Sequence, residues 1–128
     1  MLTKKEKDLI KRAKSLLGTK KVRGGVIKEV GCALMTEKGK IFEGVSLDLY
    51  CGIGFCAEHS AIAAMVTHTS ETHVKTIVAV FGKSVIPPCG RCRELMSLID
   101  KRNLETEVII SDNKKIKLEK LLPFTLNG

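Results

Sequence analysis

Apolar side chains recur along the chain with two different periods, and these periods predict where helices and strands lie. The apolar residues of the first stripe lie three or four positions apart, at Leu9, Ala13 and Leu16. This spacing is that of one helical face. Thr3 and Glu6 precede the stripe with the spacing of a capping box, so we expect a helix to begin at Thr3 and to end before Gly18.

Five shorter runs have the alternating or continuous apolar character of strands. They cover residues 29–36, 40–46, 75–81, 106–111 and 115–118. The turn at residues 37–39 ends in glycine and joins the first two runs into an expected antiparallel hairpin. Residues 19–25 and 47–55 contain glycine and follow neither period, so we expect loops there.

Two further helices are expected between these strands, and each follows a cysteine-containing segment. Residues 56–68 are rich in alanine, and apolar residues within 92–99 recur at i, i+3, i+4 and i+7. A last helical turn covers residues 119–122. Because helices and strands alternate without a linker or an internal repeat, we expect residues 1–128 to form a single domain with a layered α/β architecture.

The composition is that of a globular protein, with 44% hydrophobic and 28% charged residues and a formal net charge of +8. Nine of the 22 Lys and Arg residues lie within residues 1–23, together with two of the 14 Asp and Glu residues. A terminal charge run of this kind is typical of the solvated face of a helix. Aromatic residues, which stack on single-stranded nucleic acid, make up only 4% of the chain. We therefore expect no nucleic-acid partner.

No apolar run approaches the roughly 20 residues that a membrane-spanning helix needs. The N-terminal segment also lacks the continuous apolar core of a signal peptide. These features favour a cytoplasmic protein without a membrane partner. The chain has five cysteines, and in this compartment an odd number favours metal binding or catalysis over a disulfide scaffold.

Two short motifs, Cys56-Ala57-Glu58 and Pro88-Cys89-Gly90-Arg91-Cys92, lie at the expected N-termini of two helices. Unpaired backbone N–H groups and the positive end of the helix dipole favour thiolate over thiol at such a position. Cys89 and Cys92 are three residues apart, so both sulfurs leave the same side of their helix. If the two helices lie with their N-termini together, Cys56 completes a face of three thiolates.

Three thiolates predict a zinc ion, Zn2+, because zinc accepts tetrahedral sulfur ligands and is redox-inert. Three protein ligands leave the fourth position for water, which distinguishes a catalytic site from a structural one. Glu58 lies two residues beyond Cys56, and a carboxylate beside zinc and water is what a hydrolytic proton shuttle requires. We expect Glu58 to take a proton from water and to pass it to a departing amine.

The pairing of CAE at residues 56–58 with PCGRC at residues 88–92 resembles the cytidine deaminase superfamily, in particular its small three-cysteine members and blasticidin S deaminase. The resemblance covers most of the chain, including the segments CAEHSAI, PPCGRCREL and LEKLLPF. It implies that Cys56, Cys89 and Cys92 bind zinc and that Glu58 is the catalytic acid and base. It also implies a three-layer αβα sandwich with a mixed sheet of roughly five strands, and a homo-oligomer in which a tetramer is favoured.

The upstream segment departs from the family pattern. Cytidine deaminases usually have an Asn-x-Glu there, whose side chains hold the ribose hydroxyls, and this chain has Ser46-Leu47-Asp48. The residues that we expect to contact substrate are Ser46, Asp48, Cys51, Ala57 and Phe124. Phe124 either closes a pocket, as a neighbouring subunit's residue in a tetramer, or caps the core of its own domain.

The residue after Glu58 is a second departure. Nucleoside deaminases often have an arginine there, which offsets the charge of the thiolates, and this chain has a histidine. The residues that we expect to take over this charge compensation are His59, Arg91 and Arg93.

Three functions are compatible with these patterns. The leading one is hydrolytic deamination of cytidine or deoxycytidine, a small-molecule substrate, to the uridine product with release of ammonia, as in pyrimidine salvage. The second keeps this chemistry with blasticidin S or another aminated heterocycle as substrate. The third is a non-catalytic, zinc-stabilised RNA-binding module that uses basic residues 1–23, although structural zinc sites normally have four ligands and only three are evident.

Overall fold

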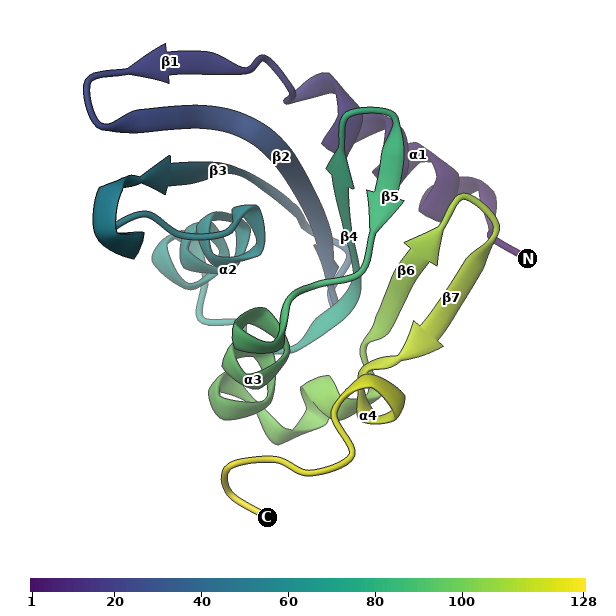
Figure 1. Cartoon of the computed structure of the whole chain (residues 1–128). Helices are drawn as coiled ribbons and strands as arrows, with labels where there is room; N and C mark the ends of the chain where they lie inside the picture. The colour runs from purple at the N-terminus through teal and green to yellow at the C-terminus, as the bar shows by residue number, and fades with distance from the viewer.

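The computed structural model describes residues 1–128, and one mixed sheet runs through the fold (Figure 1). Its strands are β1 (Lys20–Val22), β2 (Gly25–Thr36), β3 (Ile41–Leu49), β4 (Val74–Phe81), β5 (Ser84–Ile86), β6 (Glu107–Ser111) and β7 (Lys114–Lys117). The five longer strands lie in the order β3–β2–β4–β6–β7, with β4 and β6 parallel and the other neighbours antiparallel. The short strands β1 and β5 pair with β2 and β4 beside them. The mixed sheet is therefore confirmed, with two more short strands than predicted.

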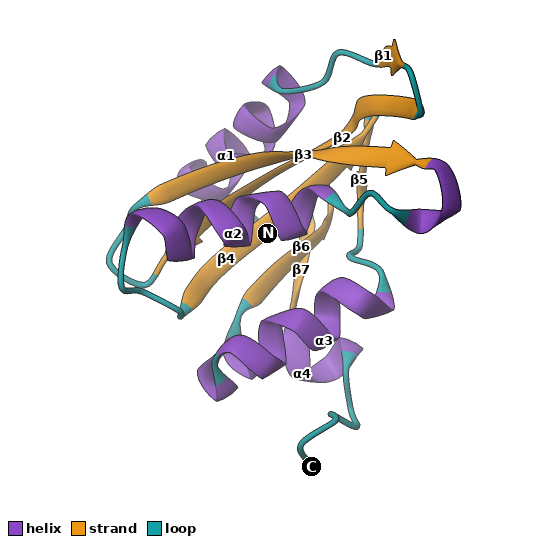
Figure 2. Cartoon of the chain, turned by 90° about the vertical axis from the view of Figure 1, so that its left-hand side faces the viewer, coloured by secondary structure: helices purple, strands orange, loops and turns teal.

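Helices cover both faces of this sheet. They are α1 (Lys4–Ser15), α2 (Ala57–His68), α3 (Gly90–Ile99) and α4 (Leu118–Leu121), with 3₁₀ turns η1 (Tyr50–Gly52) and η2 (Lys101–Glu105). Figure 2 shows α2 and α3 on the side of the sheet that faces the viewer and α1 behind it. The predicted three-layer αβα architecture is thus confirmed. No helix is both long enough and apolar enough to cross a membrane.

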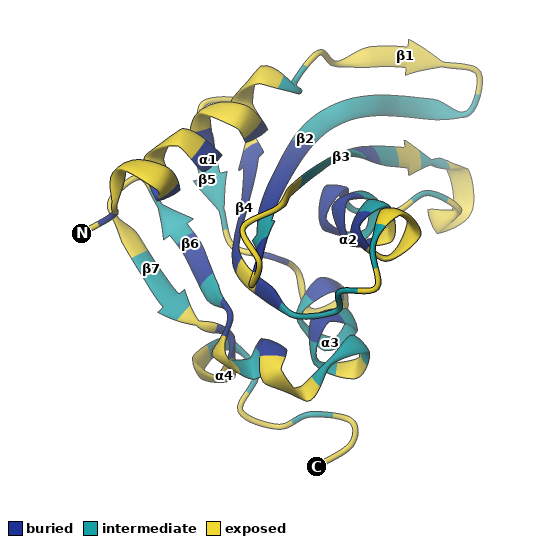
Figure 3. Cartoon of the chain, turned by 180° about the vertical axis from the view of Figure 1, so that it is seen from behind, coloured by how far each residue is buried: buried dark blue, intermediate teal, exposed yellow.

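Neighbouring residues of the central strands contribute to two different cores, one on each face of the sheet (Figure 3). The core beneath α2 and α3 takes Cys32, Leu34, Ile77 and Val108 from β2, β4 and β6. The core beneath α1 takes the adjacent residues Ala33, Val78 and Ile109. This alternation is the two-residue period of a strand that is buried on both faces. It also identifies the faces on which residues 32–34 of β2 lie.

The first helix begins as predicted. Thr3 Oγ1 accepts a hydrogen bond from the Glu6 backbone N–H at 3.2 Å, and the Glu6 carboxylate accepts one from the Thr3 N–H at 2.7 Å, which completes a capping box. The same carboxylate lies 2.7 Å from Lys115 Nζ on β7. Gly31 allows α1 to approach β2 closely, because a Cβ there would overlap the Ala13 carbonyl oxygen. These contacts fix α1 against the sheet.

The two predicted loops are partly wrong. Strand β1 lies within residues 19–25 and forms a tight hairpin with the start of β2, where Val22 pairs with Gly25. Strand β3 continues to Leu49, inside residues 47–55, before η1 begins. All three residues of β1 are exposed, so backbone hydrogen bonds to β2 hold it and no apolar period marks it. Strand β5 is equally short and was not predicted.

Candidate active site

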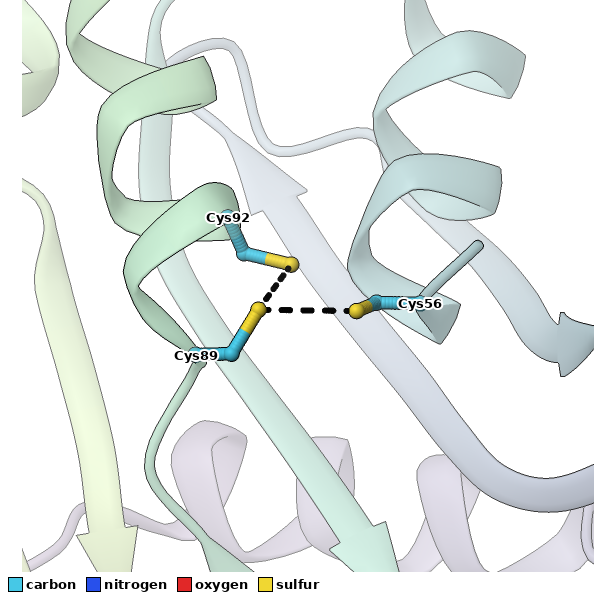
Figure 4. Close-up of side chains that lie close together, drawn as sticks. All are labelled: Cys56, Cys89 and Cys92. Atoms are coloured by element: carbon cyan, nitrogen blue, oxygen red, sulfur yellow. Dashed lines mark hydrogen bonds between the residues drawn. The ribbon is translucent and has the colours of Figure 1, made fainter. Parts of the chain in front are cut away.

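The two cysteine motifs meet where α2 and α3 begin. Cys56 is the N-cap of α2, Cys89 is the N-cap of α3, and Cys92 lies in the first turn of α3. Cys89 Sγ lies 3.5 Å from Cys56 Sγ and 3.5 Å from Cys92 Sγ (Figure 4). The expectation that both motifs lie at neighbouring helix N-termini is confirmed.

The three sulfurs have the spacing of a tetrahedral zinc site. All three lie within 4.8 Å of one another. Zn–S bonds of about 2.3 Å at tetrahedral angles hold sulfurs about 3.8 Å apart, close to the distances between these cysteines. Figure 4 shows the three sulfur atoms directed into the space between the two helices. The side chains therefore fit Zn2+, for which thiolates are preferred donors.

The three thiols differ in how readily they lose a proton. Burial alone would raise the pKa of Cys89, but hydrogen bonds from the backbone N–H groups of Cys92 and Arg91 and from neighbouring thiols lower it overall. Burial is the largest cause that raises the pKa of Cys92, and the negative charge of Glu58 is the second. Burial also raises the pKa of Cys56. Hydrogen bonds at the helix N-terminus thus favour a thiolate at Cys89, while burial favours the protonated form of the other two thiols, which the positive charge of a metal would counteract.

Glu58 is the ionisable group best placed to exchange protons at this site. It lies in the first turn of α2 and is only 4% exposed. Burial raises the pKa of its carboxyl group, although a backbone hydrogen bond and a contact with the Cys92 thiol act in the opposite direction. A buried carboxyl group with a raised pKa holds a proton more readily than an exposed one, which suits a group that must take up and release a proton.

A cavity of about 430 Å³ opens beside the cysteines and Glu58. Its size is typical of sites for small molecules. The predicted site residues that line it are Ser46, Asp48, Cys56, Ala57, Glu58, Cys89 and Arg91. Cavity residues that the sequence did not indicate include Glu29, Phe55, Phe81 and Ile86. Those four belong to a strand bulge, a loop and a hairpin whose course is set by the tertiary structure, so no local pattern marks them.

Comparison with known protein families decides the identity of this site. The family model described as "Cytidine and deoxycytidylate deaminase zinc-binding region" matches residues 3–106, which include all three cysteines and Glu58. The chain belongs to this cytidine and deoxycytidylate deaminase family. It is therefore a zinc-dependent deaminase, as the sequence predicts, and the alternative of a non-catalytic RNA-binding module is not supported.

Individual deaminases are similar to the chain in sequence or in fold. The chain is 26% identical over 98 residues to a cytidine deaminase of Halalkalibacterium halodurans, covering 74% of each chain. It is 38% identical over 78 residues to the blasticidin-S deaminase of Bacillus cereus, covering 53% of this chain and 55% of that protein. The crystal structure of a cytidine deaminase from Burkholderia pseudomallei has the same fold, with a TM-score of 0.74, 24% identity and coverage of 98% and 100%.

The position of the family's ribose motif carries a structural hydrogen bond in this deaminase. Ser46 is 8% exposed, and its Oγ accepts a hydrogen bond from the Val30 backbone N–H at 3.0 Å, beside the bulge in β2. Asp48 lies two residues further along β3 and is exposed at the cavity wall. The Ser46 hydroxyl group is therefore engaged by the backbone of β2, whereas the Asp48 carboxylate is available to accept a hydrogen bond from a ligand.

Two predicted substrate contacts do not line the cavity of a single deaminase chain. Cys51 is exposed in η1 and has a φ of 58°, in the left-handed region. Phe124 lies in the C-terminal segment and is 89% exposed. The alternative that Phe124 caps the core of its own domain is therefore wrong, because its ring is almost fully in solvent. Contact of either residue with substrate stays a prediction.

The three residues expected to offset the thiolate charge of the deaminase site have different surroundings. His59 Nδ1 lies 3.5 Å from Cys92 Sγ, and the His59 ring stacks on Phe55. Burial is the largest cause that lowers the pKa of His59, and the positive charge of Arg91 is the second. Arg93 donates to the carbonyl oxygens of Pro88 at 2.8 Å and Leu121 at 3.0 Å, which ties the start of α3 to α4.

Proposed function

We propose that the chain catalyses the hydrolytic deamination of cytidine or deoxycytidine to the uridine product, with release of ammonia. One observation carries this proposal. Three cysteine sulfurs with zinc-site spacing and the buried carboxyl group of Glu58 lie together at the wall of a cavity of nucleoside size. Family membership supplies the class of reaction, and the cavity supports a small molecule as the substrate.

In this proposal Cys56, Cys89 and Cys92 hold the zinc ion as thiolates. Zinc, when bound, supplies Lewis-acid activation of water at neutral pH. Glu58 performs the proton transfers: it takes a proton from the attacking water as the water oxygen bonds to the ring carbon that bears the amino group. Glu58 then returns that proton to the amino nitrogen, the C–N bond breaks, and ammonia leaves. The remaining proton of the added hydroxyl group moves to the adjacent ring nitrogen as the hydroxyl oxygen becomes the carbonyl oxygen. Water and the aminated ring are thereby converted to the carbonyl product and ammonia.

The cavity walls have complementary roles in the proposed reaction. Phe55, Phe81 and Ile86 supply apolar surface against which a pyrimidine ring packs and from which bulk water is excluded. Ser46 and Asp48 replace the family's ribose-binding pair, with Asp48 as the acceptor for a sugar hydroxyl. Because both side chains are shorter than the usual Asn and Glu, we expect weaker ribose recognition than in typical cytidine deaminases.

Blasticidin S is the second candidate substrate. Its support is the 38% identity to the blasticidin-S deaminase of Bacillus cereus, although that match covers 53% of this chain. The proposed proton transfers by Glu58 are unchanged for this substrate, because it also has an exocyclic amine on a pyrimidine ring. The two candidates therefore differ only in the part of the molecule that lies away from the zinc.

A substrate panel tests the proposed function. Zinc-loaded protein is incubated with cytidine, deoxycytidine, blasticidin S and a pterin that bears a ring amino group, and both the loss of the ring absorbance and the release of ammonia are followed. We expect one ammonia per product molecule from cytidine or deoxycytidine, with blasticidin S as the alternative. Absence of turnover of the whole panel by protein that contains one zinc per chain would contradict the proposal.

The assembly and location of the enzyme are also proposed. Tyr50, Ile53 and Phe124 are between 69% and 89% exposed, and such apolar groups support burial in a homo-oligomer, for which we favour a tetramer. Sedimentation equilibrium is expected to give four times the mass of one chain, and a monomer would contradict this state. A cytoplasmic location and a role in pyrimidine salvage stay predictions.

A further inference from the structure

The bulge in β2 decides which side chains of that strand reach the active-site cavity. The pairing of β2 with β3 shifts register between Ile27 and Gly31. Within this stretch Lys28 has a φ of 64°, a left-handed conformation that few residues other than glycine adopt. Bulges of this kind redirect side chains beside functional sites.

The bulge exchanges the sides on which Lys28 and Glu29 lie. Val30 lines the cavity, whereas Gly31 faces α1. In an uninterrupted strand Lys28 would share the cavity side with Val30, and Glu29 would lie on the α1 side with Gly31. The structure has the reverse arrangement. Glu29 lines the cavity next to Val30, and the Lys28 side chain ends beside Gly18 at the end of α1. The cavity thus gains a carboxylate in place of an ammonium group.

This exchange gives the cavity an excess of acidic side chains. Glu29 and Asp48 line its sheet wall, and Glu58 lies at the helix wall. Arg91 is the basic residue among the side chains that line it. A zinc ion with three thiolates would itself add one net negative charge. An anionic cavity of this kind favours cationic over neutral ligands and disfavours phosphates.

We infer that Glu29, together with Asp48, selects a pyrimidine nucleoside that bears an ammonium or guanidinium group on its sugar side, away from the zinc. This inference rests on the proposed deaminase function and adds a substrate class to it. The two carboxylates come from β2 and β3, whereas the zinc-binding cysteines come from the starts of α2 and α3. A substrate whose aminated ring lies at the helix wall therefore extends its sugar substituents toward Glu29 and Asp48.

Three sets of ligands that differ mainly in charge test this assignment. They are amino-substituted cytidines (5′-amino-5′-deoxycytidine and 3′-amino-3′-deoxycytidine), neutral cytidine, and cytidine 5′-monophosphate. Their affinities are measured by calorimetry on the zinc-loaded, full-length Glu58→Gln variant, which keeps the ligands intact. We expect at least one amino nucleoside to bind about tenfold more tightly than cytidine, the effect of one added charge-assisted hydrogen bond, and the monophosphate to bind most weakly.

Substitution of Glu29 identifies the group responsible. Glu29→Gln, which keeps the shape of the side chain, is introduced into the Glu58→Gln variant. It is expected to reduce the tenfold preference for the amino nucleoside over cytidine to about twofold or less, because the ionic part of the contact is lost. Two matched controls are Lys28→Gln, which removes an ammonium group that lies beside Gly18, and Glu105→Gln on the exposed turn η2. Both are expected to keep the preference. Equal affinity for the amino and neutral nucleosides, or a preference that survives Glu29→Gln, would overturn the inference.

Turnover of the same ligands by the wild-type enzyme separates this inference from the proposed function. If cytidine is deaminated and the amino nucleosides show no advantage in binding, only the assignment of Glu29 fails. If the amino nucleosides bind preferentially but no ligand releases ammonia, the proposed deamination of cytidine-type nucleosides fails while the anionic sheet wall is supported. Circular dichroism and zinc content of each variant verify that the fold and the metal site are intact.

Discussion

At the scale of single residues, Asp100 at the end of α3 binds both η2 and the loop that contains Thr72. Its carboxylate caps η2 by accepting from the Arg102 N–H at 2.9 Å, binds the Arg102 guanidinium at 2.7 Å, and accepts from Thr72 Oγ1 at 2.7 Å. The Arg102 hydrogen bond is the largest cause that lowers the pKa of Asp100 below its ordinary value of 3.8. The ionised form is therefore stabilised in the folded protein.

We predict that Asp100→Asn lowers the free energy of unfolding by about 1 kcal/mol at neutral pH. Because the folded state holds the pKa below 3.8, the contribution of the carboxylate is fully present above that pH and is lost as the pH falls further. Urea unfolding of both proteins between pH 7 and pH 3 measures this difference. A difference in the free energy of unfolding that increases as the pH falls would contradict the prediction. So would a difference no larger than that of the exposed control Asp112→Asn.

The residues of the active site differ in how far the sequence alone could predict them. Cys56, Cys89, Cys92 and Glu58 lie within two short motifs at helix N-termini, and local sequence fixes both the motif and the start of the helix. Glu29 reaches the cavity only because of a bulge and a left-handed Lys28, which no residue pattern in β2 signals. The roles of His59 and Arg93 likewise depend on contacts between distant segments.

At the scale of elements, the close contact between α2 and β3 positions Cys56 and Glu58. Gly44 of β3 makes this contact possible, because a Cβ at that position would overlap Ser60 and the Ala61 backbone nitrogen of α2. Ser60 Oγ also donates to the Val45 carbonyl oxygen at 2.7 Å, which fixes the first turn of α2 on the strand. The start of the helix, and hence the metal site, depends on this packing.

We predict that Gly44→Val lowers the free energy of unfolding by about 3 kcal/mol, since the added methyl groups force α2 away from β3. The same displacement is expected to weaken zinc binding, because Cys56 moves relative to the cysteines of α3. Denaturant unfolding and a competitive zinc titration measure the two effects. Gly18→Ala serves as the control, since a Cβ at Gly18 meets only the end of Lys28 at 3.9 Å. If Gly44→Val were as stable as the wild type, the close contact between β3 and α2 would not require glycine at position 44, which would contradict the prediction.

Elements with an apolar stripe or a capping box could be predicted from the sequence, and elements held by backbone pairing could not. The capping box at Thr3 and the apolar run of β4 lie close to their predicted positions. Strands β1 and β5 have three residues each and are mostly exposed, so their hydrogen bonds to β2 and β4 define them. Each of them therefore depends on pairing with a longer neighbouring strand rather than on its own composition.

At the scale of the whole molecule, the zinc site joins two helices that share one core. The side chains of α2, α3 and α4 pack in a single cluster with β2, β4 and β6. A metal ion held by cysteines of both α2 and α3 therefore stabilises the packed arrangement relative to the unfolded chain. We propose that residues 1–128 unfold as one cooperative unit, with the metal contributing to its stability.

Calorimetry of zinc-loaded and chelator-treated protein tests this coupling. We predict a single unfolding transition whose Tm falls when zinc is removed. Free zinc at 100 times its Kd contributes about 2.7 kcal/mol by mass action when it binds only the folded state. Two separate transitions would contradict the single-domain proposal. An unchanged Tm, with zinc shown to be bound beforehand, would contradict the coupling of the metal to the fold.

The most direct test of the account is the rate of ammonia release from cytidine by wild-type protein and by Glu58→Gln, both with one zinc per chain. If Glu58 transfers the proton, the variant keeps its zinc and its fold while kcat falls by about 10²- to 10⁴-fold. Deamination by Glu58→Gln at the wild-type rate would contradict the central claim that zinc on three cysteines and the Glu58 carboxylate together carry out the reaction.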